Sequence, residues 1–282
     1  YFFIISLTLS WTQSLSTLNV IPITSRDVSF SGGGGAILDS QISLNPASIQ
    51  LNKKSFNIHG QLLPNQISLL SLHAILPNKK FIYYTSISNL NFGNLKDGIT
   101  NETFSANELL LIAGMKNQFL KKLSIGSTIS YAFSKIDDLI AQSLLISIGL
   151  QSQLLKKQIG VGFILRNLGI QFDSFNNTYE KPTYQLQTSG FIKPRYLSGI
   201  LFSDIIFEKN IPGHTLITGI EFYPQNKLIL RFSNSMSFYK NYEFTSFALG
   251  IEFSMKKWSI DLANRYLIPI GYINSISIKK QL

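Results

Sequence analysis

The chain has 282 residues, of which 45% are hydrophobic, 12% aromatic and only 14% charged, whereas a typical soluble domain carries about 25% charged residues. Its 21 Phe and 12 Tyr exclude a disordered chain, and the absence of cysteine excludes disulfides, thiolate metal sites and cysteine catalysis. A net charge of +10 leaves an anionic membrane surface or nucleic acid as partners to consider.

An apolar stretch covers residues 1–9, and small polar residues follow it around Ser14 and Ser16. The stretch is shorter than the roughly 20 apolar residues that a membrane-spanning helix needs. It is typical of the apolar core of a secretory signal with small residues near the cleavage point. We therefore expect residues 1–18 to be a truncated signal peptide, with an ordinary first strand or helix as the alternative.

Residues 19–52 precede the first predicted strand and are rich in glycine and turn-forming residues. A phosphate-binding loop is excluded because no Gly-Lys-Ser/Thr follows the glycines. Two alternatives remain: a flexible linker, or a tightly packed segment in which glycine permits close approach of the backbone. The residues that define the segment are Gly32, Gly33, Gly34, Gly35, Asp39, Asn45, Pro46 and Ala47.

From residue 53 to residue 282, bulky apolar residues alternate repeatedly with small or polar ones, which indicates β-strands. Phe247, Leu249, Ile251 and Phe253, for example, lie two residues apart with Ala, Gly or Glu between them. All nine prolines fall before the first segment, in turns or at segment ends, as the missing ladder donor requires. The pattern predicts about fourteen strands, at residues 54–63, 66–76, 81–93, 104–118, 123–136, 139–153, 158–172, 182–192, 196–208, 214–223, 227–238, 243–255, 258–268 and 272–280.

The polarity of the two strand faces favours one all-β architecture over another. A soluble sandwich would turn its bulky face inward and show charged residues outside. Here the face opposite the bulky one is mostly Ser, Thr, Gly and Ala. An apolar outer wall around a polar lumen has this pattern, so we expect a transmembrane antiparallel β-barrel over residues 53–282.

The connections between the predicted strands fall into two alternating sets. Those after even-numbered strands are short, basic and free of acidic residues, as in Lys79-Lys80, Lys121-Lys122 and Lys256-Lys257. Those after odd-numbered strands include the longest ones and hold acidic residues such as Asp97 and Asp137. Because short turns of such barrels face the periplasm, an even strand count predicts that both termini are periplasmic, in the outer membrane of a Gram-negative bacterium.

Several motifs resemble one family of outer-membrane proteins. A glycine-rich stretch, an acidic residue and Asn-Pro-Ala just before the first strand are similar to the start of the FadL-like barrels, and most to the PorV/PorQ family of type IX secretion components. The short chain looks more like PorQ than PorV. One departure is Leu282, where outer-membrane proteins commonly end on an aromatic residue. The further matching motifs are Gly160-Val161-Gly162, Arg166-Asn167-Leu168-Gly169, Gly219-Ile220-Glu221-Phe222, Leu228-Ile229-Leu230-Arg231 and Gly271 followed by Ile276-Ser277-Ile278.

The resemblance implies a fourteen-stranded FadL-type barrel whose N-terminal segment, residues 19–52, packs inside the lumen as a plug or hatch. It also implies a non-enzymatic role in type IX protein secretion and cell-surface attachment. In that role the protein is a scaffold in outer-membrane lipid whose partners are other secretion-system proteins and secreted cargo. The alternative from another class is a FadL-like transporter of hydrophobic small molecules. A transporter needs a continuous apolar pocket beside the plug, whereas a scaffold can be filled solid.

Charged residues on the small-residue face are predicted to point into the lumen, since a lipid-facing charge near the midplane costs about 2–4 kcal/mol. We interpret them as structural ion pairs, with substrate binding or conduction as the alternative. Glu221 and Glu252 are expected to meet Arg231, and Arg265 or Arg166. The predicted lumen charge network is Arg166, Glu221, Arg231, Glu252, Asp261 and Arg265.

Sequence evidence for catalysis is poor. His59, His73 and His214 are scattered, without a metal-binding spacing, and no Gly-x-Ser-x-Gly elbow occurs. We therefore predict no enzyme, no metal and no cofactor. The basic residues lie in turns without an aromatic-interleaved stripe, so no nucleic acid partner is expected.

Overall fold

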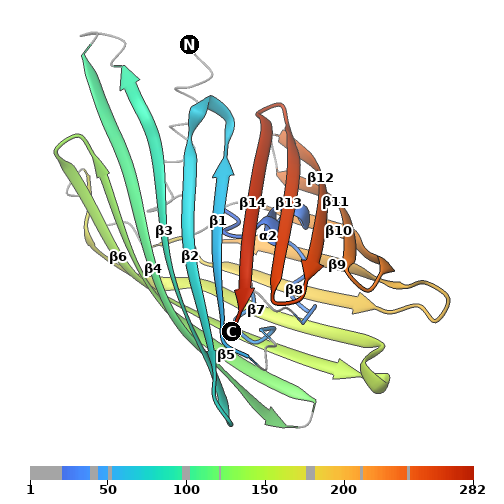
Figure 1. The fold of residues 1–282 in the computed structure, drawn as a ribbon. Helices are drawn as coiled ribbons and strands as arrows, with labels where there is room; N and C mark the ends of the chain where they lie inside the picture. The colour runs from blue at the N-terminus through green and yellow to red at the C-terminus, as the bar shows by residue number, and fades with distance from the viewer. Residues whose placement is uncertain are drawn as a thin grey trace.

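The computed structural model describes residues 21–38, 44–49, 53–96, 102–120, 122–175, 182–209, 212–239 and 242–282. Within these ranges the chain forms fourteen strands, one short α-helix and two 3-10 turns (Figure 1). The helical elements are α2 (Ser25–Ser29), η2 (Pro64–Gln66) and η3 (Leu155–Lys157). The strands are β1 (Ser55–Leu62), β2 (Ser68–Pro77), β3 (Phe81–Lys96), β4 (Thr103–Leu120), β5 (Leu123–Ile136), β6 (Leu139–Leu154), β7 (Ile159–Asp173), β8 (Gln185–Ile192), β9 (Gly199–Glu208), β10 (Gly213–Gln225), β11 (Leu228–Tyr239), β12 (Tyr242–Met255), β13 (Trp258–Ile268) and β14 (Gly271–Gln281).

The fourteen strands form one closed barrel in which each strand is antiparallel to both of its sequence neighbours and β1 pairs with β14. Closure leaves no unpaired sheet edge. The expected all-β fold is therefore confirmed, and the strands lie within a few residues of the predicted segments. The predicted and observed strands agree well because nearly every strand of this wall has one apolar and one polar face. Such a strand gives the period-two alternation from which the segments were predicted.

The bulky face of the wall points outward. Leu249 and Phe253 of β12 are 59% and 48% exposed, while Ser246 on the same strand is 1% exposed. Large apolar side chains are exposed on every strand except β10, where Leu216, Ile220 and Phe222 are half-buried. The outer surface is thus a continuous apolar wall, as expected for residues that face lipid rather than water.

The alternation changes face once within β7, at a bulge. Asn167 has a positive φ of 62°, and its backbone N–H donates to Ser147 Oγ at 3.3 Å. Phe163 points outward before the bulge at an odd position, and Phe172 points outward after it at an even one. An extra residue in one strand has this effect, and the predicted segment 158–172 did not contain it.

One end of the barrel, which we call the basic end, carries the connections that follow even-numbered strands. These are β2–β3, β4–β5, β6–β7, β8–β9, β10–β11 and β12–β13. The chain terminus Leu282 lies there too, at the end of β14 (Figure 1), and its N–H donates to Lys54 O at 2.9 Å. We call the opposite end the loop end.

Strands β3–β7 are 14–18 residues long, whereas β8 has 8 residues, so the wall is taller on one side.

Inside the barrel lie the described residues of the N-terminal segment, 21–38 and 44–49. Helix α2 packs against the inner faces of β12–β14 (Figure 1), where Val28 contacts Ala263 and Ile273. Among the described residues, no helix is long and apolar enough to cross a membrane. We refer to residues 21–38 and 44–49 as the plug.

Candidate functional site

Helix α2 is short but capped at both ends. At its start, Thr24 Oγ1 accepts from Asp27 N–H at 3.2 Å and donates to Asp27 Oδ2 at 2.8 Å. At its end, Ser31 N–H donates to Val28 O at 3.0 Å, and Gly32 N–H donates to Asp27 O at 2.9 Å. This pair of bonds is a Schellman motif, which places a left-handed residue directly after the helix. Ser31, with φ of 54°, occupies that position, and Gly32 follows it with φ of 85°.

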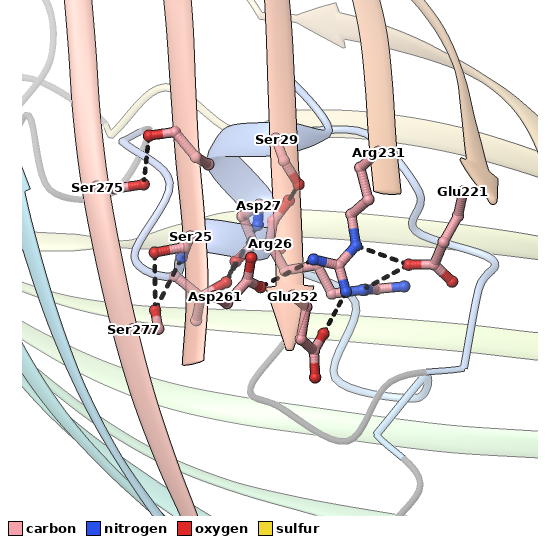
Figure 2. Close-up of polar contacts among 12 residues, drawn as sticks. Ser25, Arg26, Asp27, Ser29, Glu221, Arg231, Glu252, Asp261, Ser275 and Ser277 are labelled. Atoms are coloured by element: carbon pink, nitrogen blue, oxygen red, sulfur yellow. Dashed lines mark hydrogen bonds and ion pairs between the residues drawn. The ribbon is translucent and has the colours of Figure 1, made fainter. Parts of the chain in front are cut away.

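The hydrogen bonds of Ser25 attach the start of α2 to the seam where the barrel closes. Ser277 Oγ of β14 accepts from Ser25 N–H at 3.1 Å and lies 3.0 Å from His59 Nδ1 of β1 (Figure 2 shows Ser25 and Ser277). His59 and Ser277 are direct partners in the β1–β14 register. All three side chains are buried.

The remaining glycines of the segment allow the plug backbone to lie directly on the wall. Gly34 has φ of 79°, which disfavours any residue with a side chain. A Cβ on Gly35 would lie 2.7 Å from both Ile164 Cδ1 and Ser189 Oγ, and one on Gly33 would meet Phe202 at 2.9 Å. The structure thus places all four glycines, 32–35, inside the lumen in a packed conformation.

Asp204 of β9 holds this glycine turn, and sequence analysis did not single it out. Its Oδ2 accepts from Gly35 N–H at 3.0 Å, from Gln187 Nε2 at 2.6 Å and from Ser189 Oγ at 2.6 Å. The carboxylate is 1% exposed. The sequence does indicate its position. Leu201, Ser203 and Ile205 of the same strand point outward, so alternation places Asp204 on the inward face, as it does Glu221.

Asn45, Pro46 and Ala47 lie against the inner wall of β5 and β6 near the basic end. Asn45 Nδ2 donates to Gly35 O at 2.7 Å and to Leu150 O at 3.1 Å, while its Oδ1 accepts from Ala47 N–H at 2.9 Å. Wall glycines make room for these contacts, since a Cβ on Gly126 would lie 2.3 Å from Pro46 O. Asp39, also predicted to belong to this segment, lies outside the described residues.

Arg231 of β11 is the centre of a buried ionic cluster that joins four strands (Figure 2). Its Nε donates to Glu221 Oε2 at 2.8 Å, its Nη1 to Asp261 Oδ2 at 2.9 Å, and its Nη2 to Glu252 Oε2. Arg26 of the plug lies 3.6 Å from Glu221 Oε2. The cluster therefore attaches α2 to the wall as well as linking β10, β11, β12 and β13.

The strand register explains why one arginine serves several carboxylates. Glu221 is directly opposite Arg231, but Glu252 is directly opposite Asp261. Two like charges facing each other across a ladder repel, so this pair needs a cation between them. Gly250, which is opposite Arg231 on the β12 side, makes room for the plug, because a Cβ there would lie 2.4 Å from Ser29 Cβ.

Glu221 and Glu252 both meet Arg231, as expected, but neither forms an ion pair with Arg265 or Arg166 among the described residues. Arg265 donates to Ser246 Oγ at 3.0 Å, and Arg166 donates to Gln187 Oε1 at 2.5 Å. Arg265 is paired in register with Ala248, four residues from Glu252, which is about 13 Å along a strand. The structure thus brings together Glu221, Arg231, Glu252 and Asp261, and places both other arginines elsewhere in the lumen.

The plug meets β2–β4 through mainly apolar contacts. Near the loop end, Leu69, Leu90 and Leu110 form a buried cluster with Ile112 packed against it. Ile112 also packs against a second cluster nearer the basic end, made of Ile23, Ile49, Ile75 and Tyr84, with Ile82 at its edge. We call these two clusters, joined by Ile112, the apolar column. It follows the inner wall of β2–β4 beside the plug.

No family model and no curated protein matches the chain. Solved structures do match. The P. putida toluene transporter TodX aligns with a TM-score of 0.68 at 12% identity, over 94% of this chain and 99% of its own. A Pseudomonas aeruginosa FadL homologue aligns at 0.66 and 9% identity (93% and 99%), and the Ralstonia pickettii toluene transporter TbuX at 0.65 and 10% (94% and 100%).

These alignments show that the chain has the fold of the TodX and FadL-type barrels. The FadL-like architecture expected from the sequence is thereby confirmed. Identities of 9–12% do not distinguish families within this fold, so the PorV/PorQ assignment stays a prediction.

Proposed function

We propose that the chain is an outer-membrane barrel that admits small hydrophobic compounds past its lumen plug. The fold is that of two toluene transporters and a FadL homologue, over more than nine-tenths of each chain. The outward face is apolar around the whole barrel, which suits a bilayer.

The observation that carries the proposal is an asymmetry in how the plug is held. Toward β8–β13 the plug is fixed by directional polar contacts, chiefly those of Asp204 and the Arg231 cluster. Toward β2–β4 it lies mostly on the apolar column. An apolar compound replaces apolar contacts at little cost, whereas it cannot replace an ion pair. The plug is therefore easiest to part from the wall along the apolar column.

The proposed path begins at the loop end, near Leu69 and Leu90, and ends near Ile82 at the basic end. Polar contacts also cross it: His73 Nε2 lies 3.0 Å from Ile23 O, and Lys116 Nζ donates to Ile49 O at 2.6 Å. On the wall itself, His73 Nδ1 lies 2.9 Å from Ser86 Oγ. Passage requires no chemical step, because the protein supplies only an apolar surface and a movable segment.

Uptake of 1-N-phenylnaphthylamine into intact cells, followed by its fluorescence, tests the proposal. We expect cells whose outer membrane contains the chain to take up the probe several-fold faster than cells without it. Leu90→Gln, in the apolar column, should abolish the gain, while Ile217→Gln should not. The two residues are matched, at 0% and 1% exposed, but Ile217 packs against Phe30 on the other side of the lumen. Equal loss in both folded variants, or no gain with the native chain, contradicts the proposal.

The second candidate is the type IX secretion scaffold expected from the sequence motifs. The filled lumen favours the scaffold. Residues 21–37 and 44–49 pack against the wall, and a scaffold needs no passage through the lumen. In that case partners bind the loop end and rim. Recovery of secretion-system proteins in fixed proportion to the chain, after mild solubilisation of the outer membrane, would support the scaffold; recovery of the barrel alone would contradict it.

A further inference from the structure

A polar cavity of about 710 Å³ opens at the basic end, between the wall of β2–β7 and Leu38 of the plug. Its lining includes five lysines, Lys79, Lys80, Lys116, Lys122 and Lys157. Asparagine, glutamine and serine side chains make up most of the remainder, and none of the described lining residues is acidic. We call this cavity the lysine vestibule.

Three adjacent hairpins bring these lysines together. Lys79 and Lys80 come from the β2–β3 turn, Lys122 from the β4–β5 turn and Lys157 from η3 in the β6–β7 connection. Neighbouring hairpins of a sheet are about 10 Å apart, since each strand pair adds roughly 4.8 Å per strand. That spacing is about one Debye length at physiological ionic strength, so the positive charges reinforce one another within the mouth.

Lys116 extends the charge inward from the mouth. It is on the inner face of β4, is 7% exposed and donates to Ile49 O at 2.6 Å. None of the ion pairs among the described residues involves any of the five vestibule lysines; those pairs join Arg26 or Arg231 to Glu221, Glu252 or Asp261. The vestibule therefore holds concentrated positive charge in a concave site of ligand size.

We infer that the lysine vestibule binds a small, multiply charged anion that carries phosphate groups. Lysine binds phosphate as a compact point charge, and phosphate groups carry more negative charge per group than a carboxylate, which matches five lysines around one cavity. Amide and hydroxyl groups of the lining add neutral donors for the remaining phosphate oxygens. The vestibule lies where the apolar column ends and shares Ile82 and Lys116 with the proposed path. The inference can still fail or stand by itself, because its test measures anion binding and not the uptake of apolar compounds.

Two sources supply this chemistry: a soluble phosphate ester, or the headgroup of an anionic phospholipid. Calorimetric titration of the full chain in detergent with inorganic pyrophosphate tests for the site itself. We expect one bound pyrophosphate per chain, with an affinity that falls as salt rises. The double variant Lys79→Gln/Lys80→Gln should weaken binding about tenfold or more, because two of the five charges are lost. Lys116→Gln should weaken it too.

The matched control is Lys256→Gln/Lys257→Gln, a lysine pair in the β12–β13 turn at the same end but outside the vestibule. It should change the affinity less than twofold. An equal effect of both double variants, or equal affinity for citrate, overturns the inference, as does the absence of pyrophosphate binding. In nanodiscs, competition by phosphatidylglycerol but not by phosphatidylcholine identifies the lipid headgroup as the source, whereas unchanged pyrophosphate affinity identifies a soluble ester.

Discussion

Arg231 contacts carboxylates from three neighbouring strands, and its side chain is 1% exposed. Removing it takes the shared cation from three acidic groups, two of which face each other across the β12–β13 ladder. Leaving buried charges unpaired costs about 3–5 kcal/mol, whereas removing both members of a pair costs less than the sum of its parts.

We therefore expect Arg231→Met to lower the unfolding temperature most, and Glu221→Gln to lower it by a smaller amount. In Glu221→Gln/Arg231→Met the losses should be non-additive, with a coupling energy of about 1–3 kcal/mol. Heat-modifiable gel mobility measures the unfolding of such barrels. Asp138→Asn, in the exposed β5–β6 turn, is the control and should leave the mobility transition unchanged. Simple additivity of the two single changes would show that the pair does not interact.

Gly35 provides a second test at the scale of a single residue. A Cβ there would be 2.7 Å from two wall side chains, and the Gly35 N–H is bonded to Asp204. Gly35→Ala should therefore destabilise plug docking by about 1–3 kcal/mol through overpacking. Hydrogen exchange of residues 25–37 measures this. Gly190→Ala, where a Cβ would meet nothing closer than 4.0 Å, should leave the exchange within error. Unchanged exchange in both variants would mean that plug packing tolerates a side chain at Gly35.

Alternation in the sequence predicted on which face each charged residue lies, because that depends only on neighbours along one strand. It could not predict which residues meet across strands. Pairing of Glu252 with Arg231 rather than with Arg265 depends on register between β11, β12 and β13, which no single strand encodes. Asp204 was predictable from its inward position, but its partner Gly35 is 169 residues away in the sequence.

At the scale of elements, α2 was not predicted because five residues are too few for a helical period to emerge. Such a helix is marginal alone and depends on its caps and on packing. Thr24→Val removes the N-terminal cap and leaves Asp27 without its hydroxyl donor, which should cost about 1–2 kcal/mol of α2 stability. Faster hydrogen exchange across residues 25–32 is the expected result. Thr188→Val, on the exposed outer face of β8, should leave this exchange unchanged. If Thr24→Val also leaves it unchanged, the cap is dispensable.

At the scale of the whole molecule, strand lengths set how the barrel fits a bilayer. The 8 residues of β8 extend over about 26 Å, which at the usual tilt of about 40° is about 20 Å of height, less than the apolar band of about 25 Å that such barrels present. The 18 residues of β4 extend over about 60 Å, which at the same tilt is about 45 Å of height, so the β3–β7 side projects beyond the apolar band. The two sides of the wall therefore differ in how much strand surface extends out of the bilayer into water.

The orientation of the barrel is open to a direct measurement. An even number of strands puts the start of β1 and the end of β14 at the basic end, and we propose that this end is periplasmic. A peptide tag after Leu282 should be inaccessible to antibody in intact cells, while a tag inserted between Asp137 and Asp138, at the loop end, should be labelled. Disruption of the outer membrane should expose both. Labelling of the Leu282 tag in intact cells would reverse the proposed orientation.

The contacts of Ser25 with His59 and Ser277 have a consequence for the order in which the protein assembles. During synthesis the plug emerges before every strand, yet its docking position at the seam combines the first strand with the last. Ser25 cannot make both contacts until β14 has been completed and has paired with β1. A barrel that is still open at this seam therefore lacks the contacts that hold the start of α2, and those contacts form only when the barrel is complete.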